Sequence, residues 1–188
     1  ILATIISLYK LATKIFVLSE YAKEDLILNG INASNIFVIP NPIKLEVNHS
    51  YQEDRCLQDN AIVSITTCSR LIKSKNVDVI VNVIEYLNKS DTNFKFSLNI
   101  IGDGEESEYL KYLVKIKNLQ HAVFFHGWVD NPTQILFESD IFLFASEYEG
   151  FGNVILEAMS AGLPIVAFNS KGGVTDILNN GEYGLAIQ

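Results

Sequence analysis

The sequence predicts an α/β protein built on a parallel β-sheet with helices on both faces. From Ala61 onward, short apolar runs alternate regularly with amphipathic helical runs. Strands of a parallel sheet are buried on both faces and therefore read as short apolar runs, and the connections between them are usually helices. Residues 43–60 are instead polar with no clear period, which is typical of a linker. We therefore predict three parts: residues 1–43 as the tail of a first α/β domain, 44–60 as a linker and 61–188 as a second domain.

The predicted tail carries the start and stop signals of a strand, helix, strand unit. Ser19 is a good N-cap for a helix, and Gly30 is a good C-terminal stop. Pro40-Asn41-Pro42 ends the last strand, because proline cannot continue a central ladder. The predicted elements are a helix end over 1–13, a strand over 14–18, a helix over 19–29 and a strand over 35–39.

The predicted second domain repeats the strand and helix alternation. The run from Asn76 to Lys89 places its apolar residues on one side, as an amphipathic helix does. Pro132 stands at the start of a short helix, where proline is favoured. Ligands of such open sheets bind at the carboxyl ends of the strands, so we expect the functional site in the turns that follow them. The predicted strands are 61–67, 94–102, 122–127, 140–146, 164–168 and 184–187, and the predicted helices are 76–89, 105–118, a short one from 131, one that ends at 159, and 174–178.

Composition excludes two classes of function. A formal net charge of −8 argues against a nucleic-acid partner, because phosphate backbones require a basic surface. Cys56 and Cys68 match neither a zinc site nor a disulfide framework, and we interpret Cys68 as a buried thiol. The scattered His49, His121 and His126 form no metal-ligand cluster, so no metal site is predicted. We predict a cytoplasmic protein.

The first residues are strongly apolar, but they do not predict a membrane span. Lys10 and Lys14 interrupt the apolar run before it reaches the ~18 residues that a span needs. A signal peptide would begin with a basic region, which is absent here. We interpret the chain as cut from a longer protein at both ends and beginning inside a packed helix. The alternative is an amphipathic helix on a membrane surface.

The most informative stretch runs from Ser146 to Pro164 and reads SEYEGFGNVILEAMSAGLP. An apolar strand leads into an acidic turn, in which Gly150 and Gly152 bracket Phe151, and a helix and another strand follow. Glycines at this place let the backbone approach a ligand at the N-terminus of a helix. The stretch is therefore the main candidate for a binding site.

Two glutamates, Glu149 and Glu157, are separated by seven residues in this stretch. Asn153 and Glu157 are four apart and share one helix face, so Glu157 is expected to point towards whatever the turn holds. An isolated helical glutamate is usually only a solvated residue. The unbroken pattern E-G-F-G, then E-A-M-x-A-G-x-P, closely resembles the nucleotide-sugar signature of the retaining glycosyltransferases of family four, whose fold is called GT-B.

This resemblance covers nearly the whole chain. It implies that 61–188 is the Rossmann-like nucleotide-sugar domain, truncated at its C-terminus, and that 15–42 is the hinge segment of the acceptor domain. By resemblance, Glu157 accepts hydrogen bonds from both ribose hydroxyls, and Glu149 holds sugar hydroxyls near the reacting face. The implied nucleotide-sugar-binding residues of the turn and helix are Glu149, Gly150, Phe151, Gly152, Asn153, Val154 and Glu157.

Arg70 and Lys75 follow the first predicted strand of the second domain. Two cations at the mouth of a parallel sheet suit a diphosphate, since Arg offers a planar fork and Lys a movable point charge. The alternative is that both are simple surface residues. By resemblance, Arg70 and Lys75 clamp the donor diphosphate and neutralise the charge that builds on the leaving nucleotide, so that Arg70, Lys75 and Glu149 are the implied catalytic residues.

The run 123–130 resembles the strand and loop that line the nucleotide base in this family. Phe124 and Val129 are the nearest candidates for contacts to the base. We interpret His126 as a polar residue at a strand end, with a catalytic role as the alternative.

Two further glycine-containing turns have alternative readings. Gly102-Asp103-Gly104 lacks the third glycine of a dinucleotide fingerprint, where Ser107 stands, and the adjacent acidic residues would repel a pyrophosphate. We interpret it as a structural turn. Residues 170–173 either add backbone donors near the ligand or form a loop that needs positive backbone angles.

The resemblance implies transfer of a sugar from a nucleoside diphosphate sugar to an acceptor hydroxyl, with retention at the anomeric carbon. No cofactor or metal is implied, since cations and a helix N-terminus stabilise the departing diphosphate. The acceptor is an unknown saccharide or lipid-linked molecule, in polysaccharide or glycolipid biosynthesis at the inner face of a membrane. Any peripheral membrane association is expected through the acceptor domain. We hypothesise that the fragment alone binds a nucleotide weakly and transfers no sugar.

Three alternatives stay open. A GT-B epimerase binds the same donor but releases a free sugar, and a phosphorylase would need a pyridoxal lysine that nothing here marks. A non-catalytic nucleotide-binding module is disfavoured, because Arg70, Lys75, Glu149 and Glu157 are all intact. An NAD-dependent Rossmann enzyme is disfavoured by the poor glycine pattern.

Overall fold

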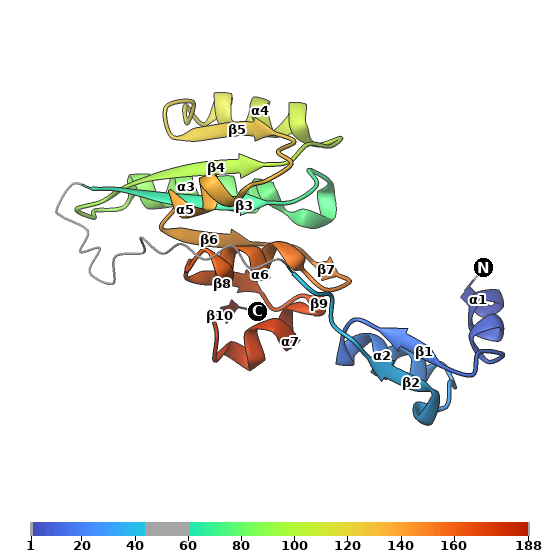
Figure 1. Cartoon of the computed structure of the whole chain (residues 1–188). Helices are drawn as coiled ribbons and strands as arrows, with labels where there is room; N and C mark the ends of the chain where they lie inside the picture. Colours follow the sequence, from blue (N-terminus) through green and yellow to red (C-terminus); the bar gives the residue numbers. More distant parts are fainter. Residues whose placement is uncertain (1, 44–60, 188) are drawn as a thin grey trace.

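The computed structural model describes residues 2–43 and 61–187, and its main body is a parallel sheet (Figure 1). Every strand pair in this sheet is parallel. Its strands are β3 (Ile62–Cys68), β4 (Lys95–Ile101), β5 (Val123–Gly127), β6 (Ile141–Phe144), β8 (Ile165–Phe168) and β10 (Leu185–Ile187). Their order across the sheet is β10-β8-β6-β3-β4-β5, which places β3 beside β6 at the centre.

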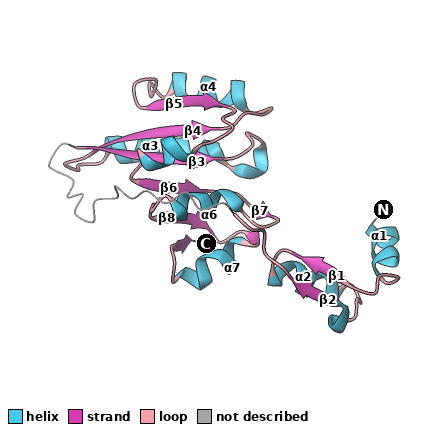
Figure 2. Cartoon of the chain, in the orientation of Figure 1, coloured by secondary structure: helices cyan, strands magenta, loops and turns pink. Residues whose placement is uncertain are grey.

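Helices cover both faces of this sheet, as Figure 2 shows with helices in cyan and strands in magenta. They are α3 (Val77–Lys89), α4 (Ser107–Ile116), α5 (Thr133–Phe137), α6 (Asn153–Ser160) and α7 (Val174–Leu178). Side chains of α3 and α4 pack against Val63, Ile65 and Leu98 on one face. Side chains of α5, α6 and α7 pack against Phe142 and Phe144 on the other. Successive strand residues point to opposite faces, and β3, β6 and β8 each contribute side chains to both clusters. The predicted fold class is confirmed.

The described N-terminal residues form a smaller unit beside the main sheet (Figure 1). In this unit β1 and β2 pair in parallel, and Ile15 and Ile36 on them pack against Leu26 of α2. The opposite face carries Phe16 and Phe37, whose ring centroids lie 5.8 Å apart. The elements are α1 (Leu2–Tyr9), β1 (Ile15–Val17), α2 (Glu20–Leu28), the short 3-10 helix η1 (Ala33–Asn35) and β2 (Ile36–Val38).

Two hydrogen bonds dock this unit on the main body. The backbone N–H of Glu20, at the start of α2, donates to Oδ2 of Asp176 at 2.7 Å. The side chain of Asn41, in the predicted hinge, donates to Oδ1 of Asn153 at 3.2 Å. A carboxylate at a helix N-terminus is favourable because the helix dipole and free N–H groups point at it. The smaller unit therefore contacts the same helix, α6, that follows the glycine turn.

Several boundaries differ from the sequence prediction. The first helix ends at Tyr9 instead of residue 13, and α4 begins at Ser107 instead of 105. The N–H of Glu106, the N-cap of α4, donates to the carbonyl of Leu71 at 2.9 Å. Pro132 is the N-cap of α5 and not its first residue. The predicted linker, 44–60, lies outside the described residues. The sequence did not predict β7 (Tyr148–Glu149), β9 (Lys171–Gly172), or the 3-10 helices η2 (Lys73–Lys75) and η3 (Asn179–Gly181).

No helix among residues 2–43 and 61–187 combines the length and the apolar character needed to cross a bilayer.

Candidate functional site

The candidate site lies at the carboxyl ends of β3, β6 and β8, where three loops meet. The loop after β3 carries Arg70 and Lys75, and the loop after β6 carries Glu149. Glu149 pairs through β7 with Gly172 in the loop after β8. The carboxyl ends of parallel strands share one edge of the sheet, so residues far apart in the chain become neighbours there.

The first of these loops is held from beneath by the glycine turn after β4. Gly102 has φ +125°, and a Cβ there would overlap the carbonyl oxygen of Ser69. The N–H of Leu71 donates to the carbonyl of Asp103 at 2.9 Å. The backbones of the two turns are thus in direct contact. The turn at 102–104 therefore has a structural role, as the sequence indicated.

Lys75 reaches across to the turn after β6 and forms an ion pair with Glu149. Its Nζ also donates to Oγ of Ser146 at 3.2 Å and to the carbonyl of Tyr148 at 3.4 Å. The two charged side chains are only 11% and 19% exposed, so the pair is largely shielded from water. Screening by salt is weak at such a site, and the two charges are strongly coupled. The structure thus brings together two of the three residues predicted to be catalytic.

The turn that carries Glu149 depends on a glycine in the neighbouring loop. Gly172 has φ +118°, and a Cβ on it would overlap the carbonyl oxygen of Glu149. The next residue, Gly173, also approaches this turn closely, because a Cβ there would lie 2.7 Å from the Cα of Phe151. Of the two readings left open for residues 170–173, the need for positive backbone angles is met at Gly172. These glycines let the two loops touch through their backbones.

Gly152 ends the turn and begins α6. Its φ of +101° places it in the left-handed region, which favours glycine. The preceding side chain, Phe151, is buried in the core between α6 and α7 and anchors the turn. Val154 is half-buried against the same core, while Asn153 is exposed and accepts the hydrogen bond of Asn41.

Glu157 lies one turn further along α6 and is half-buried. Burial raises the pKa of its carboxyl above the ordinary value. Burial, and to a smaller extent the nearby charge of Glu157, raises the pKa of the Cys68 thiol at the end of β3 to about 12. No side chain in the described residues donates a hydrogen bond to the carboxylate of Glu157.

The raised pKa of Glu157 predicts a specific pH dependence of stability. A carboxyl that binds its proton more tightly in the folded state loses stabilisation as pH rises from its unfolded pKa through its folded pKa. We expect Glu157→Gln to raise the Tm of the ligand-free protein at pH 7 and to have little effect at pH 4. Thermal denaturation at both pH values measures this. The matched control is Glu105→Gln at an exposed position, and an equal gain in Tm at both pH values for Glu157→Gln would contradict the prediction.

The remaining predicted residues are not drawn into this cluster. Arg70 is exposed in the loop after β3. Phe124 lies three residues before the end of β5, 46% exposed, and Val129 lies two residues after that end. His126 on β5 lies with Nε2 2.9 Å from Oδ1 of Asn99, which fits a polar strand residue. The two candidates for base contacts thus belong to the edge strand and not to the centre of the sheet.

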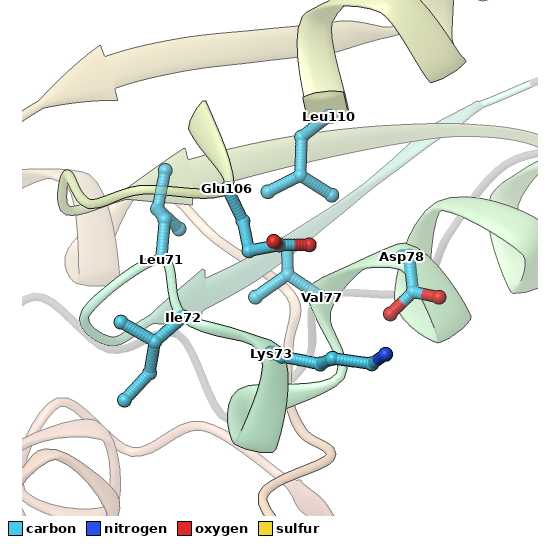
Figure 3. A pocket seen from close by; sticks show the side chains of 7 residues that line it. All are labelled: Leu71, Ile72, Lys73, Val77, Asp78, Glu106 and Leu110. Atoms are coloured by element: carbon cyan, nitrogen blue, oxygen red, sulfur yellow. The ribbon is translucent and has the colours of Figure 1, made fainter. Parts of the chain in front are cut away.

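A shallow pocket near the site has the wrong charge for a diphosphate. It lies between the loop after β3 and the first turns of α3 and α4 (Figure 3). The carboxyl groups of Asp78 and Glu106 line it beside a single cation, Lys73. Within the described part of the chain, no group of three or more His, Cys, Asp or Glu residues could hold a metal ion.

Sequence reasoning missed Ser146 and Asn76 as parts of this site. Ser146 is buried, accepts from Lys75, and donates to the carbonyl of Tyr148 at 2.8 Å. Asn76 adopts a left-handed backbone, φ 48°, between η2 and α3. The signal for Asn76 was an asparagine directly before a helix, since asparagine tolerates this conformation better than other side chains. Ser146 gave no such signal.

A comparison with known protein families shows to which family this chain belongs. The sequence profile described as Glycosyl transferases group 1 matches residues 59–188. The chain belongs to this family. The resemblance to GT-B glycosyltransferases is thereby confirmed, and it rests on most of the chain and not on the glutamate motif alone.

Two relatives show how this group 1 chain aligns with longer proteins. A poly(ribitol-phosphate) alpha-N-acetylglucosaminyltransferase of Staphylococcus aureus is 31% identical over 174 residues, which cover 93% of this chain and 33% of that protein. An N-acetylgalactosamine-N,N'-diacetylbacillosaminyl-diphospho-undecaprenol 4-alpha-N-acetylgalactosaminyltransferase of Campylobacter jejuni is 31% identical over 183 residues, which cover 96% of this chain and 48% of that protein. The group 1 chain thus spans less than half the length of both.

Solved structures agree with the fold of this group 1 chain. The crystal structure of TarM matches 97% of this chain and 35% of its own, with a TM-score of 0.79 and 28% identity. Anabaena HepE in complex with UDP-glucose matches the whole chain with a TM-score of 0.81, at 21% identity, and shows the fold alone.

Proposed function

We propose that this chain forms the donor-binding half of a glycosyltransferase that moves a sugar from a nucleoside diphosphate sugar to an acceptor hydroxyl. The observation that carries the proposal is the pairing of Lys75 with Glu149 at the mouth of a parallel sheet, across 74 residues of sequence. A diphosphate needs a cation, and a sugar needs a hydrogen-bond acceptor for its hydroxyls. The pair offers both groups at one point.

The proposed roles follow from the charge of each group and its place. Arg70 and Lys75 bind the diphosphate and stabilise the negative charge that develops on it as the sugar leaves. Glu149 accepts hydrogen bonds from sugar hydroxyls, and the free carboxylate of Glu157 accepts those of the ribose. The N-terminus of α6 adds positive potential close to Gly152. Arg70 and Lys75 thus supply the charge that a bound metal ion would otherwise provide, and we propose a metal-independent reaction without a cofactor.

Relatives support the class of donor and the stereochemistry. A Staphylococcus aureus TarM variant, matched at 28% identity, was crystallised in complex with fondaparinux, alpha-GlcNAc-glycerol and UDP. The names of the two relatives above both specify alpha-linked products. An alpha product from an alpha-linked donor requires retention, and we propose a retaining transfer.

The acceptor side is proposed from the kinds of product that the relatives make. They include a poly(ribitol-phosphate) transferase, a transferase to a diphospho-undecaprenol and an O-antigen transferase of Escherichia coli. We propose a saccharide or lipid-linked acceptor in polysaccharide or glycolipid assembly. Nucleoside diphosphate sugars and lipid-linked acceptors meet at a membrane surface, so we propose a cytoplasmic protein that works at the inner face of the membrane.

Calorimetric titration of the full-length protein with UDP and with GDP tests the donor site. We expect one nucleotide to bind, and Arg70→Ala and Glu157→Ala each to weaken it by ~1–3 kcal/mol, as for lost hydrogen bonds to charged groups. Lys73→Ala is the matched control, since Lys73 is an exposed cation in the same loop. The proposal fails if neither nucleotide binds at millimolar concentration, or if Lys73→Ala weakens binding as much as Arg70→Ala does.

A further inference from the structure

The Lys75–Glu149 pair stands on a tight connection between the loops after β3 and β6. The N–H of Glu147 donates to the carbonyl of Ser74 at 2.9 Å. The side-chain amide of Asn76 donates to the carbonyl of Ala145 at 3.1 Å and to Oε1 of Glu147 at 3.4 Å. These bonds join the residues on either side of Lys75 to the residues that lead into the turn of Glu149.

Asn76 has a left-handed backbone conformation, which is unusual for a residue other than glycine. Its φ of 48° and ψ of 39° lie in the left-handed region, which glycine adopts freely and other residues only at a cost. If backbone shape were the sole requirement at this position, glycine would serve better than asparagine. The amide of Asn76 adds what glycine could not supply, namely its two hydrogen bonds to the other loop.

A comparison within the chain distinguishes Asn76 from the other asparagines with this backbone. All non-glycine residues with positive φ in the described residues are asparagines, namely Asn76, Asn118 and Asn179. The amide of Asn179 bonds to Glu182, three residues further on. The side chain of Asn118 makes no hydrogen bond to the described residues. Among the three, Asn76 alone bonds to a segment that is distant in sequence, about 70 residues away.

We propose that Asn76 is a positioning residue that sets the Lys75 ammonium against the turn carrying Glu149. Its amide holds η2 against the exit of β6, which fixes the point from which the flexible lysine side chain extends. An ammonium group has three donors on a mobile stem, so its direction depends on where its backbone is anchored. The consequence for ligand binding rests on the proposed function, whereas the positioning of Lys75 does not.

Substitution of Asn76 separates the amide from the backbone shape. Asn76→Gly keeps the left-handed backbone and removes both bonds, and Asn76→Asp keeps an αL-tolerant side chain but removes the N–H donor. Asn118→Gly is the matched control. Without nucleotide, we expect the reactivity of Lys75 towards reductive methylation, measured by mass spectrometry, to rise several-fold in both Asn76 variants and to stay unchanged in the control. Unchanged reactivity of Lys75 in both variants would overturn the proposal.

Nucleotide binding gives a second readout in the full-length protein. We expect Asn76→Gly to weaken UDP about tenfold and UMP less than twofold, because UMP lacks the second phosphate that Lys75 would contact. Equal loss for UDP and UMP would overturn the role of Asn76 at the donor. Failure of the unmodified protein to bind UDP or GDP would count against the proposed function, and the reactivity of Lys75 would still decide on Asn76.

Discussion

Replacement of Lys75 by methionine is expected to lower sugar transfer about 10²–10³-fold, as for loss of a single preorganised donor to developing charge. The variant lacks the largely buried ammonium group that we propose binds the diphosphate, and Glu149 is left without its ion-pair partner. A buried unpaired carboxylate is costly, so part of the effect would come from the disturbed turn. Initial rates with the nucleotide sugar that the protein uses measure the effect.

Two further variants separate these causes. The double variant Lys75→Met/Glu149→Gln removes the unpaired charge. We expect this variant to regain the stability that Lys75→Met loses, while the rate of sugar transfer stays low. Lys73→Met removes an exposed cation two residues away and should leave the rate within about twofold. Transfer at the unmodified rate in Lys75→Met would show that this lysine has no part in the reaction.

Gly172→Ala is expected to cause the largest loss of stability, about 2–5 kcal/mol. The new Cβ would overlap the carbonyl oxygen of Glu149, and alanine would be held at φ +118°. The estimate combines the cost of a left-handed backbone, ~1–2 kcal/mol, with that of overpacking, ~1–3 kcal/mol. We also expect nucleotide binding to fall, since the turn carrying Glu149 must move. Chemical denaturation and calorimetry measure the two effects.

Two other glycines, each of which shares one property with Gly172, provide the controls for this prediction. Gly181 has φ +99° with open space around its Cβ position, so Gly181→Ala reports the backbone cost alone. Gly150 lies in the same turn as Glu149 with open space and no unusual φ, so Gly150→Ala reports the effect of an added methyl group. If Gly172→Ala is no more destabilising than Gly181→Ala, the predicted effect of the close contact between Gly172 and Glu149 is contradicted.

Local sequence signals predicted the elements of this fold well. The apolar runs and helical periods that predicted the sheet depend on which faces are buried, and both faces of this sheet are covered by helices. Ser19, read as an N-cap, accepts from the N–H of Ala22 at 3.2 Å. The cap signal is reliable because it arises from a contact within a few residues. The boundary of α4 lies two residues later than predicted, at a point where the N–H of Glu106 donates to a carbonyl of another loop.

The sequence by itself determined the fold class, the family and the individual residues of the glutamate motif. The tertiary structure alone decided that Lys75 meets Glu149, that Gly172 must be a glycine and that Asn76 joins two loops. These contacts follow from β3 lying beside β6 and β6 beside β8, an order that differs from the order along the chain. Periodicity shows which residues are buried in a strand, but it carries no information about which strand is its neighbour. The candidate site is made at the sheet edge that this order creates, and so only the folded chain shows which of its residues touch.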